Sequence, residues 1–437
     1  MMRLRVRGVL VLIVGVIFVC SCVLFDKDSF EGNEVFLGVE DVFCTEVVLR
    51  VGLPDSGGVN SFNVVRDDSV VGVYSTSDND TVIIDGGLMP DRDYEYRVDL
   101  VDGGRVRVSS ESVVVHTLDT TSHEVRWSID TLGIAGWISD AWVVDEDDIW
   151  VVGKIVVPDP DSSWNGTGYE DFNAAHWDGE RWELMRIVNS DPIFGIWCFS
   201  KDDMWVILYG YPVHWNGNSW TLYRFHDMGI DASALALWGT SSSDMYFVGL
   251  NGSIVHYDGK DFEKLESGTD IDLRGIWGLD REHIWVVGTS KDWSRSIVLE
   301  KEGDGWRTIY YVGAGESKPI GGFYSVWTDS YTLLYFNGLA GTCTLNLITG
   351  EDRKIDDKGL WMGEDIMGTG MNDIFSPTGG GEILHYNGRS WHVYREIKEI
   401  FGDYGVFTCV YVTRSVVIIG GYYPALRWYP IVLRGYR

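Results

Sequence analysis

The stretch LALWGTSSSDMYFVGLNGSIVHYDGKDFEK, residues 235–264, decides the fold of this chain. Its apolar segments lie at Leu235–Gly239, Met245–Gly249 and Ser253–Tyr257, and turn residues separate them. Asp258-Gly259 then predicts a hairpin turn into a fourth segment that starts at Phe262. No helical period runs through the stretch. Four strands in about 30 residues form one small antiparallel sheet, which needs neighbouring sheets to bury both of its faces.

The same pattern recurs from Trp142 to the C-terminus at intervals of about 40 residues, which is typical of β-propeller blades. The second-strand positions align at Trp150, Trp205, Tyr246, Trp285, Tyr335, Phe375 and Val417. A constant separation, as from Trp238 to Gly249, joins the first-strand anchor to the end of the second strand, which indicates a rigid first hairpin. The spacing therefore predicts seven four-stranded units.

The turn between the third and fourth strands is also repeated. Its copies read HWDGERW from His176, HWNGNSW from His214, HYDGKDF from His256 and HYNGRSW from His385. Asp or Asn caps the turn, Gly supplies a positive φ, and the flanking aromatic rings can pack across the hairpin. The pattern resembles the repeats of secreted bacterial β-propellers and, more distantly, the Asp-box of sialidase blades. The resemblance covers roughly residues 130–437 and implies a fold without an activity.

The seventh unit contains only three strands before the chain stops at Arg437. Just after the N-terminal region, His123–Ile129 (HEVRWSI) looks like a fourth strand without its blade. We therefore predict that Glu124–Ile129 lies beside Ile431–Arg434 and closes the ring, because closure removes exposed sheet edges. The propeller would then span 124–437, with 118–123 as a linker.

Residues 34–117 have a different spacing and predict a β-sandwich. The expected strands are Val35–Val39, Glu46–Val51, Ser61–Val65, Val70–Tyr74, Thr81–Ile84, Tyr94–Leu100 and Arg105–Val115. The segment LMPDRDYEY, Leu88 to Tyr96, resembles a corner of fibronectin type III domains, in which a tyrosine hydroxyl bonds back to the corner. The resemblance implies that Tyr94, Tyr96 and Val98 face inward, and that the domain is a spacer or an interaction module.

The N-terminus predicts export. Three arginines precede an unbroken apolar run, Val9 to Val19, whose length fits a signal peptide better than a membrane span. Val19-Cys20-Ser21-Cys22 then resembles a bacterial lipoprotein box, which implies that residues 1–22 form the signal and that Cys22 carries the lipid. Residues 23–33 would be a tether. The alternative is that the apolar helix is retained as an uncleaved anchor.

Composition excludes some partners. The formal net charge is −30, which argues against nucleic acid and against peripheral binding to anionic lipid. The spacing of Cys44, Cys198, Cys343 and Cys409 suggests neither a metal knuckle nor a disulfide framework, so buried free thiols are expected. The four repeated histidines are predicted to be structural or solvent-facing, because equivalent positions on different blades lie too far apart to share an ion. No metal and no cofactor are predicted.

The candidate binding residues lie in the loops that depart from the repeat. Loops joining second to third strands, and those joining blades, lie on one face of a propeller. The longest insertion, residues 154–172, contains Trp164 and Tyr169, and a second contains Trp293 and Arg295. These four side chains could form an aromatic rim that binds a sugar or a peptide.

The sequence therefore predicts an all-β protein, a fibronectin type III-like sandwich followed by a seven-bladed β-propeller. The expected function is a non-catalytic binding scaffold, anchored by lipid in the cell envelope, whose partner is an extracellular protein or glycan. No catalytic residue is predicted, since no nucleophile elbow, phosphate loop or HExxH motif occurs. Two alternatives stay open, a glycoside hydrolase with carboxylates in the propeller funnel and a purely structural envelope protein.

Overall fold

The computed structural model describes residues 34–437 except 55–57, 160–167, 317–320, 356–362 and 426. These residues form antiparallel sheets, and the α-helix among them, α1 (Arg395–Phe401), is one short connection. No helix in this described part is long and apolar enough to span a membrane. The predicted signal peptide, Cys22 and the tether lie outside the described residues.

The first two sheets pack face to face. One has the order β1-β2-β5, and the other has the order β4-β3-β6-β7, with β8 also paired to β6. Their bounds are β1 (Phe36–Val42), β2 (Glu46–Gly52), β3 (Asn60–Arg66), β4 (Ser69–Thr76), β5 (Asp80–Gly86), β6 (Asp93–Asp102), β7 (Arg105–Ser109) and β8 (Val113–His116). Both sheets turn buried side chains, among them Leu49 and Phe62, into one core. This arrangement is a β-sandwich.

Strand β6 shows the expected alternation. Tyr94, Tyr96 and Val98 are buried in the core, and the Tyr94 hydroxyl accepts a hydrogen bond from the Met89 N–H at 2.8 Å. The strand predicted at Arg105–Val115 is interrupted, however. The Ser110 hydroxyl accepts the Val98 N–H at 3.0 Å in place of a backbone carbonyl, so pairing with β6 shifts between β7 and β8.

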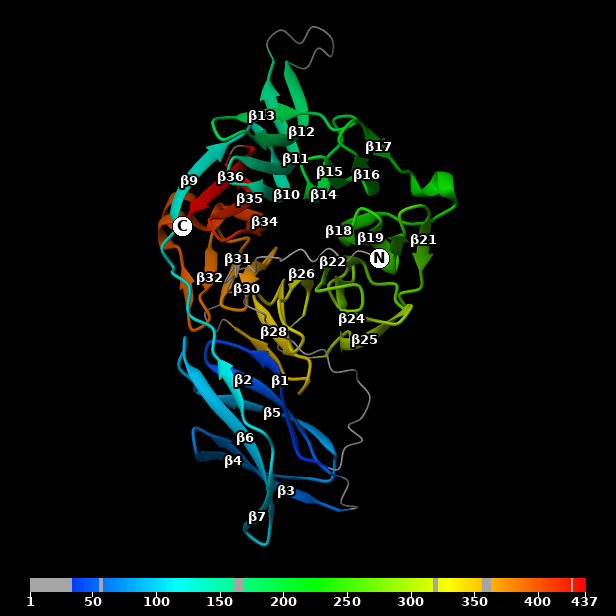
Figure 1. Cartoon of the computed structure of the whole chain (residues 1–437). Coiled ribbons are helices and arrows are strands. Elements are labelled where there is room, and N and C mark those ends of the chain that lie inside the picture. Colours follow the sequence, from blue (N-terminus) through cyan, green and yellow to red (C-terminus); the bar gives the residue numbers. More distant parts are fainter. Residues whose placement is uncertain (1–33, 55–57, 160–167, 317–320, 356–362, 426) are drawn as a thin grey trace, which may run out of the picture.

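Seven four-stranded antiparallel sheets follow along the described chain. The first three contain β10 (Ala135–Asp145), β11 (Asp148–Pro158), β12 (Tyr169–Trp177) and β13 (Trp182–Met185); β14 (Ile193–Ser200), β15 (Asp203–Leu208), β16 (Tyr211–Trp215) and β17 (Trp220–Leu222); β18 (Ala234–Ser241), β19 (Asp244–Gly249), β20 (Ile254–Tyr257) and β21 (Phe262–Leu265). The next three contain β22 (Leu273–Gly278), β23 (Ile284–Thr289), β24 (Ser296–Glu302) and β25 (Gly305–Val312); β26 (Phe323–Trp327), β27 (Leu333–Gly338), β28 (Cys343–Asn346) and β29 (Asp352–Lys354); β30 (Met367–Gly370), β31 (Asp373–Pro377), β32 (Ile383–Tyr386) and β33 (Trp391–Val393). The sheets surround a common centre with their first strands innermost (Figure 1).

The last sheet joins the two ends of this region. Its order is β34 (Val406–Val412), β35 (Val416–Pro424), β36 (Trp428–Tyr436) and β9 (Arg126–Thr131). Trp127 lies opposite Gly435, and Thr131 lies opposite Ile431. The predicted pairing of a segment near Trp127 with the C-terminal strand is therefore present, and it closes the circle of sheets.

The repeated histidines each bind an aspartate within their own sheet. The Nε2–Oδ1 pairs are His176–Asp148, His214–Asp203 and His256–Asp244 at 2.8 Å, and His385–Asp373 at 3.0 Å. Each imidazole also stacks on the second-strand aromatic ring, which is Trp150, Trp205, Tyr246 or Phe375. The motif therefore fastens the third strand to the start of the second.

The four cysteines of the described region, Cys44, Cys198, Cys343 and Cys409, are free and buried. This confirms the expectation of buried thiols. Burial raises the pKa of each thiol above its ordinary value.

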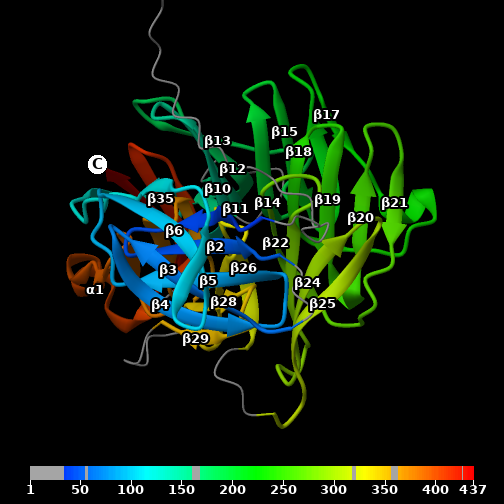
Figure 2. The same ribbon diagram turned by 60° about the horizontal axis from the view of Figure 1, so that its bottom comes forward.

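The sandwich packs against the sheets β26–β29 and β30–β33 (Figures 1 and 2). Thr332 in the β26–β27 turn donates to Asp41 at 2.9 Å, and Phe43 belongs to one cluster with Trp327. Asn372, in the β30–β31 turn, donates to the Asp119 carbonyl at 2.7 Å. Because strands alternate in direction, turns between first and second strands lie on one face and the second-to-third loops lie on the other. The sandwich therefore contacts the face opposite the predicted binding loops.

Candidate functional site

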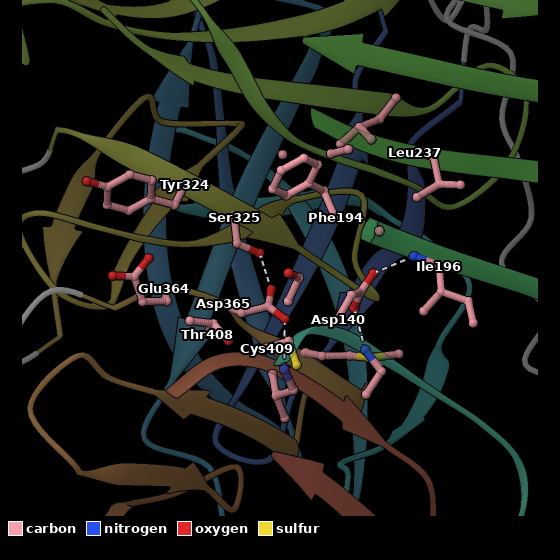
Figure 3. Close-up of a pocket in the computed structure, with 18 of the residues that line it drawn as sticks. Asp140, Phe194, Ile196, Leu237, Tyr324, Ser325, Glu364, Asp365, Thr408 and Cys409 are labelled. Carbon is pink, nitrogen blue, oxygen red and sulfur yellow. Dashed lines mark hydrogen bonds between the residues drawn. The ribbon is translucent and has the colours of Figure 1, made fainter. Parts of the chain in front are cut away.

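A cavity of about 200 Å³ lies at the centre of the ring, lined by residues of the first strand of every sheet or, at β30, by those just before it. The cavity opens near the starts of these strands, on the face of the ring where the loops between neighbouring sheets lie. We call it the central pocket; Figure 3 shows it at close range. Because seven strands converge here, residues far apart in sequence become neighbours.

A β-bulge recurs at the same place in each first strand. The register against the second strand shifts by one residue, as between Ile138 and Asp140 in β10. The shift before β30 lies between the Gly363–Thr378 bridge and the Met367–Phe375 pair. The side chains at the shifts line the pocket and are Ser139, Phe194, Leu235, Arg274, Tyr324, Glu364 and Thr408. Bulges redirect side chains, and here they form the pocket mouth.

Asp140 follows the bulge of β10 and lines the pocket. Its Oδ1 accepts the Ala141 N–H and its Oδ2 accepts the Ile196 N–H, each at 2.8 Å. The second bond reaches the neighbouring sheet. The carboxylate therefore joins the first strands β10 and β14, which lack a ladder at this point.

Asp365 occupies the matching position before β30. Its Oδ1 accepts the Ser325 hydroxyl at 2.6 Å and the Ile366 N–H at 2.8 Å. Its Oδ2 accepts the Val410 N–H of β34 at 2.9 Å. Asp140 and Asp365 thus play the same structural role on two sheets that flank β34.

Burial raises the pKa of Asp140 to about 8, because its backbone hydrogen bonds offset only part of the lost solvation and the charge of Asp365 adds to the effect. Burial also raises the pKa of Asp365, despite its three hydrogen bonds. At the mouth, burial raises the pKa of Glu364, while the charge of Arg274 acts in the opposite direction. The pocket therefore contains carboxyl groups that water stabilises poorly.

Aromatic rings form the inner part of the pocket. The Trp142 ring lies 4.7 Å from that of Trp197 and 4.6 Å from that of Tyr411, and Trp197 lies 6.1 Å from Trp277. These rings come from the repeated first-strand positions two residues beyond the carboxylate positions. The tryptophan pairs pack edge to face and the Trp142–Tyr411 pair is tilted, and together these rings form the aromatic floor of the pocket.

Three of the four predicted rim residues are described, and they belong to two different sheets of the ring. Trp293 is exposed beside the mouth, with its ring 5.6 Å from Tyr324 and 5.5 Å from the Arg274 guanidinium. Arg295, in the same loop, forms an ion pair with Asp270 at 2.8 Å. Thus one predicted residue, Trp293, contacts the pocket mouth.

Tyr169 begins β12 in a different sheet. The Arg427 guanidinium lies over its ring at 5.4 Å and donates to its hydroxyl at 3.3 Å. No contact in the described part of the chain joins Tyr169 to Trp293. Trp164 lies outside the described residues.

The sequence prediction did not include the two partly buried aspartates, Asp140 and Asp365. A usable signal existed, since the position two residues before the first-strand anchor reads Asp140, Gly195, Ala236, Gly275, Ser325, Asp365 and Cys409. Two aspartates at a position where the other repeats have small, uncharged residues would have pointed to the central pocket.

No family model matches the sequence, and no curated protein matches it. Solved structures do resemble the fold. A structure described as YCF48 bound to D1 peptide has a TM-score of 0.54 and 15% identity, covering 73% of this chain and 97% of that chain. The structure of YCF48 from Cyanidioschyzon merolae has a TM-score of 0.52 and 14% sequence identity, and the match covers 71% of this chain and 98% of that chain. The WD40 β-propeller domain of Doa1 has a TM-score of 0.51 and 10% sequence identity, and the match covers 72% of this chain and 98% of that chain. The chain is therefore similar to β-propellers in fold, and the central pocket lies where their inner strands converge.

Proposed function

We propose that the chain is a non-catalytic binding scaffold that holds a peptide or protein segment over the central pocket. The observation that supports it best is the pocket itself, a cavity with an aromatic floor on the face that the sandwich leaves open. Exposed Trp293 and the bulged Phe194 and Tyr324 enlarge the mouth with apolar surface. A similar propeller, YCF48, has been solved with a peptide bound.

In this proposal the scaffold is a fibronectin type III-like sandwich joined to a seven-bladed propeller. The Tyr94 hydrogen bond at the β5–β6 corner supports the first assignment, and the seven four-stranded sheets support the second. The contacts of Asp41 and Phe43 with the ring would fix the sandwich against the propeller. A crystal structure of the chain tests both assignments.

Replacing the aromatic mouth is expected to weaken binding. The full-length chain in detergent is screened against a random-peptide display library and an envelope extract. Phe194→Ala and Tyr324→Ala should reduce capture of the selected peptides about tenfold or more, because aromatic anchors dominate such interfaces. Trp293→Ala and Trp164→Ala test the predicted rim, and a glycan array tests a sugar ligand.

Val144→Ala is the matched control, since Val144 is exposed near the β10–β11 turn on the opposite face. It should leave binding unchanged. Equal binding by the control and the Phe194 and Tyr324 variants would place the ligand elsewhere.

The proposed location is the cell envelope, with Cys22 as the lipid attachment. In cells fed a palmitate analogue, we expect the full chain to be labelled and Cys22→Ser to lose the label and leave the membrane fraction. Multiple acyl chains give stable anchoring, whereas one holds marginally. Cys20→Ser is the control and should keep the label. Labelling that survives Cys22→Ser would contradict the lipoprotein assignment.

A glycoside hydrolase is the second candidate, because two carboxyl groups with raised pKa lie in the propeller funnel. The binding function is better supported, since both carboxylates already accept backbone N–H groups that join adjacent sheets. The experiment is hydrolysis of a panel of nitrophenyl glycosides. Turnover that Asp140→Asn abolishes would favour the enzyme over the scaffold.

A further inference from the structure

The two partly buried carboxylates of the central pocket, Asp140 and Asp365, lack a counter-ion among the described residues. Other buried aspartates have one: Arg281 lies 3.0 Å from Asp244, and Arg437 lies 2.6 Å from Asp373. From the residues that the structure describes, Asp140 and Asp365 accept hydrogen bonds only from backbone N–H groups and one serine hydroxyl. A carboxylate can accept about four hydrogen bonds, so unused acceptor capacity remains beside the cavity.

The surroundings of these carboxylates suit an organic cation. The rings of Trp142, Trp197 and Tyr411 line the same space and contact one another. Aromatic faces attract ammonium and guanidinium groups by about 0.5–2 kcal/mol. The volume of about 200 Å³ exceeds that of several waters, at roughly 30 Å³ each, and could admit one long side chain.

Among the described residues that line the pocket, Arg274 is the only one of positive charge, and its contacts lie at the mouth. Its guanidinium lies 5.5 Å from the Trp293 ring and 5.7 Å from the Tyr324 ring, and its charge acts on Glu364. Because the charges of Glu364 and Arg274 at the mouth offset each other, Asp140 and Asp365 determine the charge that the interior of the pocket can carry. The net charge of −30 further favours approach of a basic partner.

We propose that the central pocket binds one cationic group of a partner polypeptide, an arginine or lysine side chain, inserted between the aromatic rings and the carboxylates of Asp140 and Asp365. This proposal rests on the proposed function and names the chemistry of its ligand. A metal ion is disfavoured, because no group of three or more His, Cys, Asp or Glu in the described part of the chain could hold one. Long apolar stems with a charged head suit a pocket whose carboxylates lie between aromatic rings at the mouth and at the floor.

The inference predicts a pH dependence whose sign is fixed. Since burial places the pKa of Asp140 at about 8, the unliganded group is largely protonated in neutral buffer. A bound cation favours the carboxylate, so binding releases a proton and tightens as pH rises. Affinity should increase roughly tenfold between about pH 6.5 and about pH 8.5, while guanidinium stays protonated throughout.

The test uses isothermal titration of the full-length chain with two acetylated, amidated pentapeptides, Gly-Ala-Arg-Ala-Gly and its citrulline analogue. The two peptides differ at one group, where the neutral ureido group of citrulline replaces the guanidinium. We expect the arginine peptide to bind at least about tenfold more tightly. Asp140→Asn and Asp365→Asn should each remove most of that preference, and Asp202→Asn, an exposed residue in the β14–β15 turn, should not.

The pH series on the unsubstituted chain keeps the test valid if either variant unfolds. A preference for citrulline or for an acidic Gly-Ala-Glu-Ala-Gly peptide, or a flat pH profile, would overturn the cation assignment. Saturable binding of Ca²⁺ alone that competes with the arginine peptide would also overturn it. If library peptides bind the mouth without a basic residue, the proposed function survives and this inference fails; if no peptide binds, both fail.

Discussion

Deleting the closing strand Arg126–Thr131 is expected to abolish cooperative folding of the ring. The deletion exposes the edge of β36 and removes Trp127, which packs with the core cluster of the last sheet and lies 5.3 Å from the Tyr394 ring. An exposed apolar strand edge promotes aggregation. We expect the deleted chain to be insoluble or to lose its sharp thermal transition, as measured by circular dichroism and calorimetry.

Point substitutions refine this expectation. Trp127→Ala should lower the free energy of unfolding by about 3 kcal/mol, while Ile129→Ala, on the same strand and exposed, should cost less than about 1 kcal/mol. A Cβ at Gly435 would lie 2.7 Å from the Trp127 ring. Gly435→Ala should therefore cost less in the Trp127→Ala background than in the natural sequence. Additive costs would show that the two strands do not pack as described.

Asp373→Ala is expected to have the second large effect. The Asp373 side chain is 2% exposed and accepts bonds from His385 at 3.0 Å and from Arg437 at 2.6 Å. Removing it leaves a buried histidine and an arginine without their partner, which costs about 3–5 kcal/mol. The melting temperature should fall by roughly 10 °C.

The matched control is Asp148→Ala, the same motif position in the first sheet. Asp148 is 21% exposed and its partner His176 lies 2.8 Å away, so the loss should be about 1 kcal/mol. Equal losses at the two positions would contradict the role assigned to burial and to Arg437.

The acid dependence of Asp373 has a defined sign. Burial alone would raise its pKa, but the hydrogen bonds from His385, Arg437 and Thr369 outweigh burial and bring the pKa to about 2. A carboxyl whose pKa is lower in the folded state stabilises the protein above its unfolded pKa of about 3.9. Roughly 2–3 kcal/mol should therefore be lost as pH falls from about 4 to about 2, and Asp373→Ala should lack this component.

The fold was largely predictable because its signals are local. Apolar segments, hairpin turns such as Asp258-Gly259 and the spacing from Trp238 to Gly249 depend on a few consecutive residues. The helix α1 was not predicted, because a helix of seven residues is too short for its hydrophobic period to be recognised in the sequence. The break at Ser110 was missed because its hydroxyl acts on a residue of another strand.

Part of the candidate site could be located and part could not. Loop length directed attention to Trp293, which does lie at the pocket mouth. It could not show that Arg295 turns to Asp270 or that Tyr169 turns to Arg427, because side-chain direction depends on neighbours distant in sequence.

The order of strands, their turns and the partner of the final strand were determined by the sequence alone, since each follows from hydrophobic period and turn chemistry within about 40 residues. Only the tertiary structure brought Asp140 and Asp365 together beside β34, and only it placed Asp41 against the ring. The physical reason is that the first strands of all seven sheets converge on one centre. A bulge is one residue in its own strand, but seven strands meeting at one centre combine their bulges into a pocket whose charge no single repeat contains.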